Sequence, residues 1–172
     1  MKDTWIVFDL IGVLAEPSWR DLYAEPDLER WSAFKRGEYP EEEFWEERLA
    51  SLYRAMLRFR ADRLALVRSL HANGYRICIA TNFSTEWYKV LLDQLKDREL
   101  FEQAVISSEI GVAKPERGFW NVLLEKVPRG SIFVDDRKEN CEAAREAGFR
   151  PVWAYLGAPV REKIDELLAE AN

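Results

Sequence analysis

The chain of 172 residues predicts an α/β domain with a parallel sheet of about five strands and helices on both faces. Short runs rich in β-branched and aromatic residues recur along it, as expected of strands buried on both faces. Helical patterns separate these runs, and such alternation favours a parallel sheet. The stretch 16–73 breaks the alternation because it contains helical patterns and no convincing strand. We therefore expect a core formed by 1–15 and 74–172, with a small helical cap at 16–73 inserted after the first strand.

Five apolar runs mark the expected strands. They lie at 4–8, 76–80, 103–106, 131–134 and 151–155, and the run at 103–106 is the weakest. Polar residues follow three of them directly, namely Asp9, Thr81 and Asp135. Because ligands of open α/β sheets bind beyond the carboxyl ends of the strands, these positions are candidates for a functional site.

Helical patterns fill the intervals between the strands. One pattern ends at Asn73-Gly74, a typical helix stop, and Ser84 is a suitable cap for the next. Two more occupy 137–147 and 159–171. Within the cap, one helix is expected at 27–36, ending at Gly37, and a second from Pro40 to about residue 56.

The composition narrows the possible functions. A net charge of -6 and a pI near 5.1 argue against a dedicated binder of nucleic acid or anionic membranes. No apolar run approaches the roughly 20 residues needed to span a bilayer, and no secretory signal is visible, so we expect a cytoplasmic protein. Cys78 and Cys141 have no zinc or disulfide spacing and are expected to be free thiols. His71, the single histidine, lies far from other polar clusters, which argues against histidine-dependent triads.

The strand-end residues and one loop lysine form a chemically coherent group. Asp9, Thr81-Asn82, Asp135-Asp136 and Lys114 are expected to converge at one edge of the sheet. A carboxylate can attack phosphorus and divide one difficult displacement into two easier steps. An anionic nucleophile repels a phosphate, so a cation is needed between them, and carboxylate oxygens are ligands that Mg²⁺ prefers.

Four segments resemble the motifs of the haloacid dehalogenase-like superfamily, in the family's order. They are Val-Phe-Asp-Leu-Ile-Gly-Val-Leu at 7–14, Ile-Ala-Thr-Asn at 79–82, Gly-Val-Ala-Lys-Pro-Glu at 111–116 and Phe-Val-Asp-Asp-Arg-Lys-Glu-Asn at 133–140. The resemblance covers residues 4 to about 155 and implies a Rossmann-like core. The closest subgroup carries a small helical cap and includes sugar-phosphate phosphatases and the amino-terminal phosphatase domain of soluble epoxide hydrolases.

The resemblance implies a role for each site residue. Asp9 would be the nucleophile and a Mg²⁺ ligand, and Lys114 would neutralise its charge and that of the substrate. Thr81 and the amide of Asn82 would bind phosphate. Asp136 would ligate Mg²⁺ directly, Asp135 directly or through water, and the backbone carbonyl of Ile11 would complete the protein's ligands. The implied substrate is a small phosphorylated metabolite, and the oligomeric state is open.

The sequence departs from the family pattern at Ile11. Most family phosphatases have an aspartate here that protonates the leaving group and later activates water, and isoleucine can do neither. Three readings follow: a Mg²⁺-dependent phosphatase without its usual acid, a catalytically silent binding or scaffolding relative, and a 2-haloacid dehalogenase. The last needs no metal, and the Asp135-Asp136 pair argues against it. A phospho-receiver domain is discarded because its paired acids follow the first strand. Trp19, Arg20, Arg58 and Arg60 are further candidates that could face the cleft from the lid, although a surface role is favoured for each.

Overall fold

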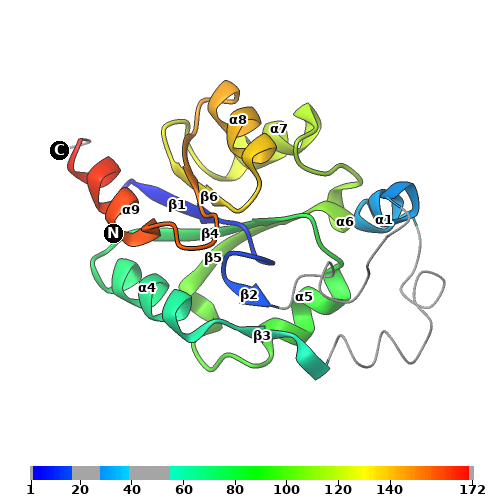
Figure 1. Cartoon of the computed structure of the whole chain (residues 1–172), viewed down its shortest axis with the longest axis horizontal. Coiled ribbons are helices and arrows are strands. Elements are labelled where there is room, and N and C mark those ends of the chain that lie inside the picture. The colour runs from blue at the N-terminus through cyan, green and yellow to red at the C-terminus, as the bar shows by residue number, and fades with distance from the viewer. Residues whose placement is uncertain (1, 17–27, 39–54, 171–172) are drawn as a thin grey trace.

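The computed structural model describes residues 2–16, 28–38 and 55–170, and Figure 1 shows their arrangement. Within these residues no helix has the length and apolar character needed to cross a membrane.

One five-stranded sheet organises the chain. Its strands are β1 (Trp5–Phe8), β4 (Arg76–Thr81), β5 (Phe101–Ile106), β6 (Ile132–Asp135) and β7 (Arg150–Trp153). They lie in the order β5-β4-β1-β6-β7 and every neighbouring pair is parallel, as predicted. The chain fills the β4–β5 side of β1 first and then crosses to β6, so the order reverses beside β1. A crevice at such a reversal is where open α/β sheets bind ligands.

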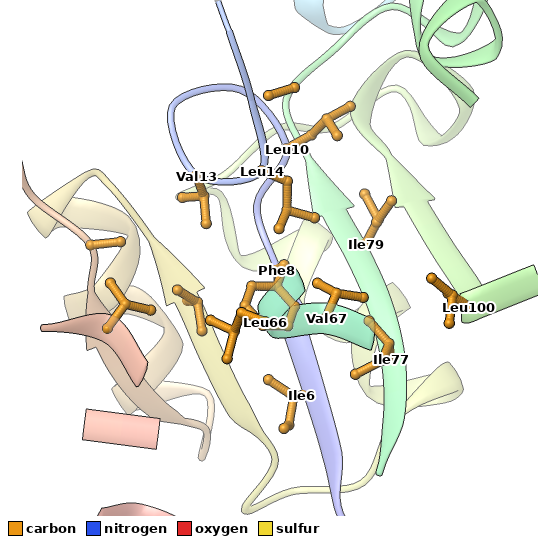
Figure 2. Close-up of a cluster of buried hydrophobic side chains, with 14 of the residues drawn as sticks. Ile6, Phe8, Leu10, Val13, Leu14, Leu66, Val67, Ile77, Ile79 and Leu100 are labelled. Carbon is orange, nitrogen blue, oxygen red and sulfur yellow. The ribbon is translucent and has the colours of Figure 1, made fainter. Parts of the chain in front are cut away.

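Helices cover both faces of this sheet. α4 (Ala61–Ala72), α5 (Thr85–Leu92) and α9 (Val160–Ala169) share one apolar cluster with Ile6 and Phe8 of β1. α7 (Arg117–Lys126) and α8 (Lys138–Glu146) share a second cluster with Trp5 and Val7. Successive residues of β1 thus enter opposite layers, which explains why the strand is apolar throughout. Figure 1 shows α7 and α8 on one side of the sheet and α4 and α5 on the other, and Figure 2 shows part of the first cluster.

Three helical elements were not predicted. They are the 3-10 helix η2 (Arg98–Leu100), the single turn α6 (Ser107–Ile110) and, of greater length, α7 itself. From the sequence, only a loop is expected around Lys114, between the third and fourth strands. α7 forms because Phe119, Trp120 and Leu123 recur at helical spacing and pack on the sheet.

The expected cap is only partly described. α1 (Leu28–Lys35) ends before Gly37, whose φ is 76°, as predicted. The hydroxyl of Ser107 donates a hydrogen bond to the carbonyl of Lys35, which fastens the end of α1 to α6. Residues 40–54 of the second expected cap helix lie outside the described residues, so that helix stays a prediction.

Two observations bear on the expected cap range of 16–73, which stays a prediction. α4 lies inside that range, yet Leu66, Val67 and Leu70 pack in the apolar cluster beside the sheet, so this helix is part of the core layer. The range also contains a strand, because β3 (Arg58–Phe59) pairs antiparallel with β2 (Ala15–Glu16). This two-residue pairing is too short to leave a strand pattern in the sequence. The remaining boundaries of the cap stay a prediction.

Candidate active site

The loop after β1 places Asp9 at the reversal of strand order. Its backbone N–H donates to the carbonyl of Val134 at 2.8 Å, which continues the β1–β6 pairing to the end of the strand. The chain then turns back on itself, since the N–H groups of Leu14 and Ala15 both donate to the carbonyl of Leu10. The carboxyl group of Asp9 therefore lies at the carboxyl edge of the sheet, and only 7% of the residue is exposed.

Gly12 lets this loop approach the acid pair. Its φ is 95°, a conformation that favours glycine. A Cβ atom at this position would lie 2.6 Å from Oδ2 of Asp136. Glycine is therefore required both by the backbone conformation and by the nearby carboxylate.

Lys114 connects the two halves of the site. Its Nζ donates to Oδ1 of Asp9 at 2.8 Å, to Oδ2 of Asp135 at 2.7 Å and to the carbonyl of Ala80 at 2.7 Å. These bonds use all three donors of an ammonium group. The Lys114 side chain is only 1% exposed, so both ion pairs are shielded from water.

Asn82 holds the lysine loop in place. Its side-chain amide donates to the carbonyl of Lys114 at 2.7 Å and accepts from the N–H of Lys114 at 2.7 Å. The indole of Trp120 adds a bond to the carbonyl of Pro115 at 3.0 Å. The Asn82 side chain thus positions Lys114, a role that the sequence analysis did not predict.

Asp135 accepts hydrogen bonds from several groups of the protein. Besides Lys114, the backbone N–H of Arg137 donates to it at 2.9 Å and the amide of Asn140 at 3.0 and 3.1 Å. Asp135 is fully buried. Asn140 was missed as a site residue, although its place in the fourth motif and on the first turn of α8 was available as a signal.

Three carboxylates gather around this lysine. Asp9, Asp135 and Asp136 each offer an oxygen, and these oxygens all lie within 4.8 Å of one another. Burial raises the pKa of Asp9 to about 7, and Asp135 and Asp136 add to this rise while Lys114 opposes it. Burial alone would lower the pKa of Lys114, but Asp135 and Asp9 raise it above its ordinary value.

The donor set suits a hard divalent cation. Three acids lie together and Lys114 bonds to two of them, so a second positive charge would relieve their repulsion. Carboxylate oxygens are the ligands expected for Mg²⁺, and the spacing of the three groups allows them to share one ion. The residues present therefore fit the metal that the sequence suggested.

The remaining predicted residues divide into three groups. Thr81 is buried at the end of β4, the strand beside β1. Ile11 is half-buried against the apolar cluster and lies in the loop between Asp9 and Gly12. Arg58 and Arg60 form ion pairs with Glu16 and Asp62, and Trp19 and Arg20 lie outside the described residues, so the lid roles of all four stay predictions.

The fold and site agree with the class of hydrolases that the sequence motifs resemble. Residues 27–148 match the haloacid dehalogenase-like hydrolase family, so the chain belongs to that family.

Individual relatives extend the comparison. The chain is 26% identical over 166 residues to the sesquiterpene phosphatase astK of Aspergillus oryzae, which covers 83% of this chain and 85% of that protein. It is 28% identical over 159 residues to the drimenol cyclase drtB of Aspergillus calidoustus, covering 81% of this chain but only 30% of that longer protein. Among solved structures, the magnesium complex of the HAD family enzyme bt-2542 from Bacteroides thetaiotaomicron superposes with a TM-score of 0.78 at 18% identity, covering 94% of this chain and 98% of that one. At this identity the structural likeness establishes the fold.

Proposed function

We propose that this chain is a Mg²⁺-dependent phosphatase that forms an aspartyl-phosphate on Asp9. The observation that carries the proposal is the cluster of Asp9, Asp135 and Asp136, with oxygens within 4.8 Å of one another and Lys114 bonded to two of them. Such a site can hold a cation and a phosphoryl group beside a carboxylate nucleophile. The phosphatase name of the Aspergillus oryzae relative supports the same reaction class.

Each protein group has a defined part in the reaction. Lys114 donates a hydrogen bond to Oδ1 of Asp9, so the second carboxylate oxygen is available to attack phosphorus. As this oxygen bonds to phosphorus, the bond between phosphorus and the ester oxygen breaks. Thr81 and the backbone amide of Asn82 would donate to the phosphoryl oxygens, where negative charge develops. Water then attacks the aspartyl-phosphate, which releases inorganic phosphate and restores the Asp9 carboxylate.

The metal ligands would be Asp9, Asp136 and the carbonyl of Ile11. Bound Mg²⁺ would neutralise the charge between Asp9 and the phosphoryl group. Asp135 already accepts hydrogen bonds from three groups of the protein, which supports a contact to the metal through water and a direct one from Asp136.

Ile11 is the reason for retaining a second candidate function. Its side chain packs against the apolar cluster and supplies neither an acid nor a base. General acid–base help is typically worth about 10²–10⁴ in rate, so hydrolysis of most phosphate esters would be slow. Activated esters, whose leaving group needs no proton, would at best be hydrolysed at rates comparable to those of relatives that have the acid. The second candidate is a binding protein that keeps the metal and phosphate site without turnover.

The name of one relative supports a proposal for the substrate class. Since astK is named for a sesquiterpene substrate, we propose a phosphate monoester of a small apolar molecule in preference to a sugar phosphate. A dehalogenase remains the least supported alternative, and chloride release from a 2-haloacid without Mg²⁺ would be its signature.

The decisive experiment measures release of phosphate from para-nitrophenyl phosphate with and without Mg²⁺. We expect Mg²⁺-dependent turnover that Asp9→Asn abolishes and that the matched exposed control Asp62→Asn retains. Turnover that persists in Asp9→Asn would refute the nucleophile assignment. Absence of turnover over a panel of phosphate esters, together with binding of beryllium fluoride and Mg²⁺, would establish the binding protein instead. In the phosphatase case, Ile11→Asp should raise turnover of alkyl phosphates, whose leaving group needs a proton, by about 10²–10⁴.

A further inference from the structure

Exposed apolar side chains are concentrated at the end of β7. Trp153, Tyr155 and Leu156, which we call the rim ledge, are 41%, 43% and 98% exposed. Among the other large apolar side chains that the structure describes, only those of Met56 and Val90 are exposed to a similar extent. Exposed apolar groups that gather in one place, unlike single ones, indicate a binding surface.

The rim ledge begins at the acid site. Trp153 is the last residue of β7 and lies opposite Asp135 in the β6–β7 pairing. Its indole N–H donates to the carbonyl of Asp136 at 2.9 Å. Only β6 separates β7 from β1, and two strand spacings of about 4.8 Å place these strands about 10 Å apart. The ledge therefore starts about two strand spacings from Asp9 along the same edge of the sheet.

The backbone holds the ledge in this position. The rings of Trp153 and Tyr155 have centroids 4.9 Å apart at an interplanar angle of 55°, and Nζ of Lys163 lies 5.3 Å from the centre of the Tyr155 ring. The N–H of Ala158 donates to the carbonyl of Tyr155 at 2.9 Å, which closes the turn that carries Leu156. Ala154 before the turn and Ala158 after it are both in the apolar cluster. The fold thus anchors both ends of a segment whose central leucine it leaves in solvent.

We infer that the rim ledge binds the apolar part of a phosphate monoester whose phosphoryl group lies at Asp9, an inference that rests on the proposed function. The indole and phenol rings and the leucine offer apolar surface beside a polar site, which suits an alkyl or isoprenoid chain. A sugar would lose water from its hydroxyl groups on this surface, and among the ledge side chains only Tyr155 carries a further hydrogen-bonding group, because the Trp153 N–H already donates to Asp136. The ledge therefore selects for the length of an apolar chain.

The test uses alkylphosphonates, whose P–C bond a phosphatase of this kind does not cleave. Binding of ethyl-, butyl-, hexyl- and octylphosphonate in the presence of Mg²⁺ is measured by calorimetry on the full chain. Full burial of one methylene strengthens binding about fourfold, so we expect about two- to fourfold per added methylene on this open surface. The double variant Tyr155→Ser/Leu156→Ser should flatten this dependence, and Val90→Ser, on α5, should keep it. Turnover of para-nitrophenyl phosphate is measured in parallel.

The outcomes separate this inference from the proposed function. Equal affinity for all four phosphonates, or binding of none, would overturn the inference, whether or not para-nitrophenyl phosphate is hydrolysed. A steep dependence that survives in the double variant would place the chain elsewhere and would also overturn it. A steep, ledge-dependent series without any hydrolysis would uphold the ledge and reject the phosphatase. Sedimentation adds one control: a dimer that Leu156→Ser dissociates would assign the ledge to a second copy of this chain.

Discussion

Replacing Lys114 by methionine tests the buried charge arrangement directly. Methionine keeps much of the apolar stem but removes the ammonium group that bonds to Asp9 and Asp135. Breaking a buried ion pair by removing one partner typically costs about 3–5 kcal/mol, because the remaining charge has no compensation. Since a domain is typically stable by only about 5–15 kcal/mol, Lys114→Met should lose a large share of its free energy of unfolding.

Urea unfolding provides the measurement, in buffer without divalent ions. With an m-value of about 2 kcal/mol/M, the expected loss moves the midpoint down by about 1.5–2.5 M. Because the loss of stability in Lys114→Met comes from unpaired buried negative charge, adding Asp9→Asn to this variant should destabilise it much less than Asp9→Asn destabilises the unchanged protein. Mg²⁺ should also restore part of the stability of Lys114→Met.

The pH dependence of this variant has a defined sign. Without Lys114 the opposing influence on Asp9 disappears, so its folded pKa rises further above the ordinary value of 3.8. The folded state then holds protons that the unfolded state has lost, and the free energy of unfolding falls as the pH rises above about 4. The deficit should therefore be smaller at pH 5 than at pH 8. A loss below about 1 kcal/mol that is independent of both pH and Asp9 would refute the buried bridge.

Three further predictions concern other residues. Asn82→Ala removes both hydrogen bonds to the Lys114 backbone, so the free energy of unfolding in urea should fall by about 1–3 kcal/mol and phosphatase turnover should also fall. Full turnover in this variant would show that Lys114 does not need the support of Asn82. Gly12→Ala places a Cβ against the Asp136 carboxylate and puts alanine in a backbone conformation with positive φ. The affinity for Mg²⁺ measured by calorimetry should weaken, and the free energy of unfolding should fall by at least about 1–2 kcal/mol. An unchanged affinity would contradict the close approach of the loop to Asp136. Burial raises the pKa of the Cys78 thiol from 9.0 to about 12, so the folded thiol keeps its proton at a pH where the unfolded thiol ionises. The free energy of unfolding should therefore fall by about 1.4 kcal/mol per pH unit above pH 9. Urea unfolding at several pH values should show that Cys78→Ala removes this part of the slope, and identical slopes in the two proteins would reject the shift.

The layered architecture could be predicted because its signals are local. Apolar runs such as the one ending at Asp9 and helix stops such as Asn73-Gly74 depend on short stretches of chain. The α7 segment is the main failure. Gly118 lowers its helix propensity, and only packing of its aromatic residues on the sheet makes the helix favourable. The layer that α4 joins could not be predicted for a related reason, since α4 has the same helical pattern whether it packs on a cap or on the sheet.

The convergence of the acids and the lysine could also be predicted in outline. Parallel strands end at one edge, so Asp9, Asp135 and Asp136 had to lie near one another once the sheet was correct. The pattern did not reveal that the Asn82 side chain supports the lysine loop, or that Asn140 returns from α8 to bind Asp135.

The amino-acid sequence alone determined the alternating strands and helices, the family motifs and the missing acid at Ile11, because periodicity and residue type are properties of the chain itself. The tertiary structure decided which carboxylates Lys114 bridges, which layer α4 joins and where the exposed aromatic residues at the end of β7 lie relative to the acids. These features depend on distances between residues far apart in the chain, and packing of the two helical layers on the sheet sets those distances.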